Sequence, residues 1–138
     1  MKYLFILISF LSFIQFSLAA EKAYTLQSGD ASLSVVKDGK RLSLQTGNAH
    51  YLSLNAPYVV TLEVNAETLN GYYSSVKEEK GSLVCIAKLK SSHGTVFHVK
   101  DVFAPDTENH FRMDREVTIE KIGKGDDYFN SYFGLTLQ

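Results

Sequence analysis

The stretch TVFHVKDVFAPDTENHFRMDREVTIEKI, residues 95–122, decides the fold. Its two halves alternate between apolar and polar residues with a period of two, as strands with one buried face do. A short polar loop, PDTEN (105–109), separates the two halves. The stretch therefore predicts two long antiparallel strands, over 95–104 and 110–122, joined as a hairpin.

One charged residue interrupts the apolar face of each strand, Asp101 in the first and Arg115 in the second. If the loop centres on Glu108, these two residues lie directly opposite each other. A buried pair of opposite charges fixes the register, because a slip would leave both charges in an apolar setting. We predict a structural ion pair between Asp101 and Arg115. Binding of an acidic or hydroxylated ligand by either side chain is the alternative.

The remainder of the chain has the same texture of alternation, Gly-marked turns and β-branched or aromatic residues. It predicts further strands at 31–39, 41–47, 50–55, 58–64, 71–78, 82–90 and 128–138, and a weak tendency to helix only at 65–71. Asp38-Gly39 is a hairpin-turn signal. Because the connections are short and polar, consecutive strands are expected to pair antiparallel. The predicted fold class is all-β, an antiparallel β-sandwich or part of a curved supersandwich.

The first twenty residues, MKYLFILISFLSFIQFSLAA, have the layout of a secretory signal peptide. One early cation, Lys2, precedes an uncharged apolar run that ends in small residues. Cleavage after Ala19 fits better than cleavage after Ala20, and the apolar run is short for a transmembrane anchor. We predict a signal peptide over 1–20 and a β-sandwich domain over 21–138. The protein is then exported, to the periplasm or the extracellular space, with no membrane attachment after cleavage.

Charge and cysteine content exclude several function classes. The net charge of −1, without clustered Lys and Arg, is not that of a nucleic-acid-binding protein. The single cysteine, Cys85, rules out an intramolecular disulfide and lies in an apolar run, as buried thiols do. The four histidines are scattered, no Ser or Cys nucleophile elbow is present, and no glycine-rich phosphate loop occurs. The sequence therefore predicts no metal and no cofactor.

Two groups of residues, a pair of carboxylates and several tyrosines, could form a functional site or could be ordinary surface residues. Asp114 and Glu116 share a strand face at ~7 Å, within the range of inverting glycosidases, but they belong to a plain solvated face. Three pairs of tyrosines could stack on sugar rings, Tyr51 with Tyr58, Tyr72 with Tyr73, and Tyr128 with Tyr132. Of these, Tyr72 and Tyr73 beside Gly71 are predicted as ligand-binding residues.

Residues 97–138 resemble the amino-terminal β-sandwich of secreted bacterial glycosidases with an (α/α)6 six-hairpin catalytic domain. In that family a strand ending in Asp-Val-Phe is followed by a polar loop, a strand carrying DR.V.I, and a strand of the type F.S.F.L. The corresponding residues here are Asp101 to Phe103, Asp114 to Ile119, and Phe129 to Leu135. The resemblance covers these last forty residues or so well, and the others only in strand texture.

The resemblance implies that the sandwich packs on a helical domain and helps to shape a sugar cleft. In that family the catalytic carboxylates lie in the helical domain, so no catalytic residue is carried over to this chain. The apolar face of Phe129, Phe133, Leu135 and Leu137 is still running at residue 138, and the sandwich is expected to be incomplete.

The expected function is an exported, carbohydrate-associated accessory domain of a glycosidase-like protein, non-catalytic alone, with a glycan and a missing helical catalytic domain as partners. The alternative is a self-sufficient exported module that binds or adheres to a protein through exposed sheet edges. A small lipocalin-like barrel for an apolar ligand is a third reading.

Overall fold

A computed structural model describes residues 22–47, 49–53, 58–134 and 136–137. They form an all-β fold of antiparallel strands, as the sequence predicts, arranged as a sandwich. The predicted signal peptide and its cleavage site lie outside the described residues. No helix among the described residues is long and apolar enough to cross a membrane.

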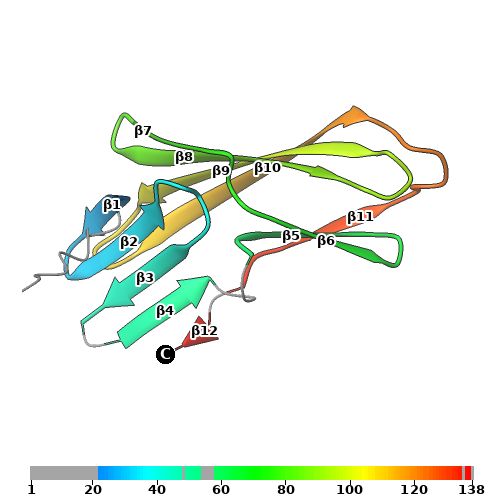
Figure 1. The fold of residues 1–138 in the computed structure, drawn as a ribbon. Helices are drawn as coiled ribbons and strands as arrows, with labels where there is room; N and C mark the ends of the chain where they lie inside the picture. Colours follow the sequence, from blue (N-terminus) through cyan, green and yellow to red (C-terminus); the bar gives the residue numbers. More distant parts are fainter. Residues whose placement is uncertain (1–21, 48, 54–57, 135, 138) are drawn as a thin grey trace, which may run out of the picture.

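Three sheets make up the fold (Figure 1). The five-stranded sheet has the order β1-β2-β3-β4-β12, with β1 Ala23–Ser28, β2 Ala31–Val36, β3 Leu42–Thr46, β4 Ala49–Ser53 and β12 Thr136–Leu137. The four-stranded sheet has the order β10-β9-β8-β7, with β7 Ser75–Glu79, β8 Ser82–Lys90, β9 Val96–Pro105 and β10 Phe111–Lys121. The three-stranded sheet has the order β11-β5-β6, with β5 Val60–Val64, β6 Glu67–Gly71 and β11 Phe129–Tyr132.

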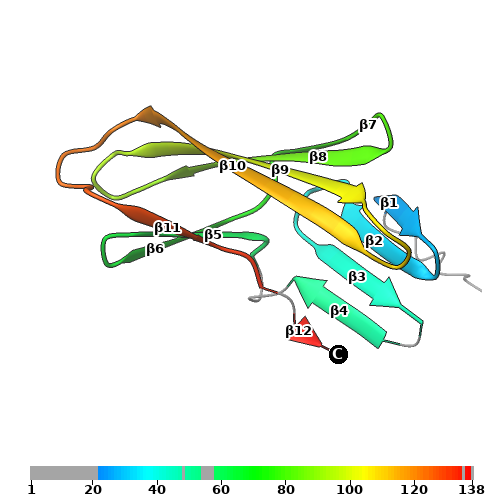
Figure 2. The same ribbon diagram turned by 180° about the vertical axis from the view of Figure 1, so that it is seen from behind.

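The long four-stranded sheet forms one layer of the sandwich. Figures 1 and 2 show the other two sheets side by side against it, the five-stranded sheet under one half and the three-stranded sheet under the other. One hydrophobic core joins all three sheets, with members such as Leu33, Leu62 and Val99 that are at most 4% exposed. The alternation of apolar residues therefore directs one face of each sheet into a shared interior.

The hairpin that decided the fold has the predicted register. Phe103 pairs with Met113, Asp101 with Arg115 and Val99 with Val117. The Asp38-Gly39 turn is also present, with a positive φ of 73° at Gly39. A Cβ atom there would lie 1.9 Å from the Tyr73 carbonyl oxygen, so glycine is required by space as well as by conformation.

Several expectations about strands were wrong. The strand β1 was not predicted, and β4 with β5 and β6 with β7 are consecutive strands that do not pair. Residues 65–71 contain β6 instead of a helical turn, because pairing with β5 outweighs the weak local preference. The final segment is not one strand. The strand β11 ends at Tyr132, and the two-residue β12 joins the five-stranded sheet beside β4. Finally, β11 does not pair with its predecessor β10 but crosses the sandwich to pair with β5, with Phe129 opposite Val64.

Candidate functional site

The structure brings the two predicted charges together in the interior. Arg115 Nε lies 2.6 Å from Asp101 Oδ1, and Arg115 Nη2 lies 2.6 Å from Asp101 Oδ2. The Asp101 side chain is fully buried and that of Arg115 is 9% exposed. Two parallel N–H···O bonds of this kind are the strongest geometry for a guanidinium and a carboxylate.

Arg115 also holds the strand β11. Its Nη1 donates to Ser131 Oγ at 3.0 Å and to the Tyr132 carbonyl oxygen at 2.7 Å, and its guanidinium lies 5.9 Å from the Phe133 ring centroid. Four of the five N–H donors of the guanidinium therefore have partners within the chain. This arrangement favours a structural role for Arg115 over ligand binding, and it ties β10 to β11 across the two layers.

Tyr72 and Tyr73, the tyrosines predicted to bind a ligand, lie in different environments. Tyr73 is 2% exposed and donates its hydroxyl to Asp101 Oδ2 at 2.5 Å. Burial, together with the negative Asp101, raises the Tyr73 pKa well above its ordinary value. A ring this deeply buried has no free face for a sugar, so the predicted sugar contact does not apply to Tyr73. Tyr72 is half-buried and packs against Tyr58, with ring centroids 5.4 Å apart, and its ligand role stays a prediction.

A different pair of tyrosines lies on the outer face of the β11-β5-β6 sheet. Tyr128 is 58% exposed and Tyr132 is 46% exposed. Alternation places Asn130 between them on the same face, and strand pairing adds Thr61, Glu63, Thr68 and Asn70 from β5 and β6. We call these seven residues the tyrosine face. It carries hydroxyl, amide and carboxylate groups and has no Lys or Arg.

Both exposed rings are held along the sheet by their hydroxyl groups. Tyr132 donates to Glu63 Oε2 at 2.5 Å, and Tyr128 donates to the Asn65 carbonyl oxygen at 3.1 Å. The Tyr132 hydroxyl therefore reaches from β11 to β5, and the Tyr128 hydroxyl reaches from the residue before β11 to the turn after β5. The hydrogen bond to the Glu63 carboxylate raises the Tyr132 pKa. Four residues of extended chain place the two tyrosine Cα atoms ~13 Å apart.

The loop that leads into β11 is fixed by buried and half-buried polar groups. The Asp126 side chain is 4% exposed and accepts hydrogen bonds from Ser91 Oγ at 2.6 Å and from the Thr95 hydroxyl. His93 Nδ1 lies 2.9 Å from its other oxygen. The hydroxyl groups of Ser91 and Thr95, with His93, lower the Asp126 pKa to about 2. This loop therefore presents Tyr128 from a fixed position.

The same cluster does not form a catalytic triad. Ser91 and His93 both bond Asp126, and no bond joins the serine to the histidine, which nucleophile activation requires. On the outer face of β10, Asp114 is bonded to Arg112 Nε at 2.9 Å. Among the described residues, no group of three or more His, Cys, Asp or Glu side chains could hold a metal ion.

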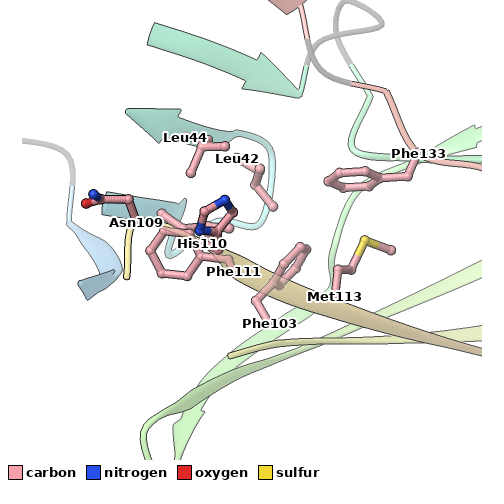
Figure 3. A pocket seen from close by; sticks show the side chains of 9 residues that line it. Leu42, Leu44, Phe103, Asn109, His110, Phe111, Met113 and Phe133 are labelled. Atoms are coloured by element: carbon pink, nitrogen blue, oxygen red, sulfur yellow. The ribbon is translucent and has the colours of Figure 1, made fainter. Parts of the chain in front are cut away.

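An apolar cavity of about 200 Å³ opens between the five-stranded and four-stranded sheets (Figure 3). Its walls include Leu33, Leu42 and Leu44 on one side and Phe103, Phe111 and Phe133 on the other. Met113 completes the apolar lining, and Asn109 and His110 bring the polar atoms. This cavity lies at the opposite end of the sandwich from the β10–β11 loop.

Comparison with known proteins adds no relative. A scan against protein-family models, a search of the curated proteins and a search of the solved structures each gave no match. The candidate sites therefore rest on the geometry of this chain.

Sequence reasoning named the tyrosine pair of this face but ranked Tyr72 and Tyr73 above it. Tyr72 and Tyr73 were preferred because they adjoin Gly71, whereas strand pairing decides which rings reach solvent. The useful signal was the spacing of Tyr128 and Tyr132, which have equal parity along one strand.

Proposed function

We propose that this protein is an exported, non-catalytic accessory β-sandwich that binds a glycan through the tyrosine face. The observation that carries the proposal is the pair of exposed rings, Tyr128 and Tyr132. Each is held by its hydroxyl group, and the other groups of the tyrosine face are hydroxyls, amides and one carboxylate.

The chemistry of the face suits a sugar chain. The apolar C–H faces of a pyranose pack on aromatic rings, while its hydroxyl groups bond to carboxylate and amide oxygens. Two separate rings, on backbone positions ~13 Å apart, offer two stacking surfaces, which favours an oligosaccharide over a monosaccharide. Glu63 is the only charged group of the face, so a neutral glycan suits it better than a sulfated or uronic one.

The resemblance to the sandwich of six-hairpin glycosidases supports the same class of ligand. In this proposal the sandwich supplies glycan contact to a glycosidase-like protein, and the chemistry belongs to a separate helical domain. The motif residues Phe129 and Ser131 alternate along β11 with Asn130 and Tyr132 of the tyrosine face, so the same strand carries both.

The test is binding of the secreted protein to neutral and acidic polysaccharides, by affinity electrophoresis and a glycan array. Tyr128→Ala and Tyr132→Ala are each expected to weaken binding at least tenfold, since each removes one stacking surface. Tyr72→Ala is the matched control, because that ring is half-buried and packs against Tyr58. Loss of binding in the Tyr72 variant alone would show that the glycan binds near Tyr72 and not on the tyrosine face. Absence of glycan binding by the unaltered protein would refute the proposal.

The second candidate is a protein-binding module that uses a sheet edge. Within the described residues, β10 pairs as a strand with β9 alone, so its eleven residues form a long edge where another strand could add. Ile119 and Ile122 beside that edge are 41% and 71% exposed. A partner added to this edge would protect the β10 amides from hydrogen exchange, and a glycan on the tyrosine face would leave them unchanged.

A further inference from the structure

The apolar cavity between the sheets is separate from the tyrosine face, and its size sets the scale of what it can hold. At about 200 Å³ it exceeds the roughly 150 Å³ cavity that binds benzene in an engineered protein core. Protein interiors contain few voids larger than a water molecule, since unfilled apolar space forfeits packing contacts. A space of this volume accommodates one aromatic ring with one or two further heavy atoms.

The lining decides the character of the occupant. Three phenylalanine rings and the Met113 thioether converge on the space from β9, β10 and the segment after β11 (Figure 3). Aromatic rings pack favourably edge to face and against sulfur, so the walls favour an aromatic occupant over an alkyl one. Among the described residues, no Lys, Arg, Asp or Glu lines the cavity. A charged ligand would lose its hydration without a counter-charge, so the occupant is neutral.

His110 adds one directional polar contact. Its Nδ1 lies 2.7 Å from the Glu108 carbonyl oxygen, which can only accept, so Nδ1 carries the proton. In the neutral ring Nε2 is then a hydrogen-bond acceptor. A ligand hydroxyl would supply the matching donor.

The loop that carries His110 is preformed. The Asn109 side chain accepts from the Asp30 backbone N–H at 2.6 Å, and Ser28 Oγ donates to the Thr107 carbonyl oxygen at 2.8 Å. These bonds join the β9–β10 loop to the β1–β2 turn. The mouth of the cavity is therefore held from both layers of the sandwich.

From these observations we infer that the cavity is a binding site for a small neutral phenol, with the ring among the phenylalanines and the hydroxyl donated to His110 Nε2. This inference does not depend on the proposed glycan binding.

The experiment titrates the full secreted protein with p-cresol, toluene and p-toluate, followed by calorimetry and by amide NMR shifts. We expect p-cresol to bind at least tenfold more tightly than toluene, and p-toluate to bind more weakly than both. His110→Ala is expected to lower p-cresol affinity to that of toluene, since it removes the proposed acceptor while leaving the apolar walls. Leu44→Phe, which fills part of the space, is expected to lower the affinity for both ligands at least tenfold.

Several results would overturn the inference. These are no saturable binding of p-cresol, equal affinity for p-cresol and toluene in the unaltered protein, or unchanged p-cresol affinity in the His110 variant. Leu44→Phe is interpreted only if its circular dichroism and cooperative unfolding match the parent. If Leu44→Phe fails to fold, the His110→Ala variant still tests the inference, because His110 is exposed and its substitution leaves the core intact.

Discussion

The buried ion pair between Asp101 and Arg115 gives the most specific prediction about stability. Replacing Asp101 with alanine leaves a guanidinium that is 9% exposed without its carboxylate and removes the acceptor of the Tyr73 hydroxyl. Breaking a buried pair from one side costs about 3–5 kcal/mol. A domain of this size has a total stability of about 5–15 kcal/mol, so the loss is a large fraction of it. The corresponding fall in Tm is ~10–20 °C.

The measurement is a double-mutant cycle by urea unfolding. We expect Asp101→Ala and Arg115→Ala each to lower the free energy of unfolding by ~3–5 kcal/mol. The loss of unfolding free energy in the double variant should be smaller than the sum of the two single losses by ~1–3 kcal/mol. The reason is that the second substitution removes a charge that the first has left buried without a partner. Arg115→Ala should additionally speed amide exchange in β11, since it removes the bonds to Ser131 and to the Tyr132 carbonyl.

The matched control lies on the same strand, three residues and one residue before Arg115. Arg112 and Asp114 form an ion pair at 2.9 Å on the same strand, but their side chains are 62% and 60% exposed. Alanine at either position should cost at most ~1 kcal/mol. Additive losses in the Asp101–Arg115 cycle, or equal losses in the two cycles, would refute the reasoning.

Three further predictions concern the rest of the sandwich. The Asp126 pKa of about 2 lies below its ordinary 3.8, so its bonds stabilise the fold above about pH 4 and the benefit is lost as pH falls toward 2. Asp126→Asn should flatten that part of the acid-unfolding curve. A Cβ atom at Gly123 would lie 2.3 Å from the His93 carbonyl oxygen, so Gly123→Ala should cost ~1–3 kcal/mol by urea unfolding, and a wild-type midpoint would contradict this packing. Burial raises the Cys85 pKa to about 12, so a disulfide reagent at pH 8 should react with it only after denaturant is added.

The hairpin was predictable because two independent signals agree on it. Alternation assigned the faces, and the isolated charges Asp101 and Arg115 selected one register among those that alternation allows. Local pattern failed where pairing between distant segments decides the outcome. In β6 only Leu69 is buried, so the segment has little apolar periodicity of its own, and its strand conformation comes from the bonds to β5.

The candidate site was partly predictable for the same reason. Tyrosines could be listed from the sequence, but their exposure depends on the partner of β11. A short loop after β10 suggested a hairpin, whereas Ser131 and Tyr132 are held from across the sandwich by Arg115. Once β11 pairs with β5, the parity of Tyr128 and Tyr132 places both rings outward.

The crossing of β11 has a consequence for the order of folding. Hairpins such as β8–β9 and β9–β10 form between neighbours in sequence, but Phe129 must find Val64 in the other half of the chain. Non-local pairings close late, because the loop entropy is lost before their contacts form. The guanidinium of Arg115 would then pair with Asp101 first. The strand β11 would dock later, by forming its hydrogen bonds to this already positioned guanidinium. The edge of the tyrosine face would accordingly be the last part of the sheet to acquire its native order.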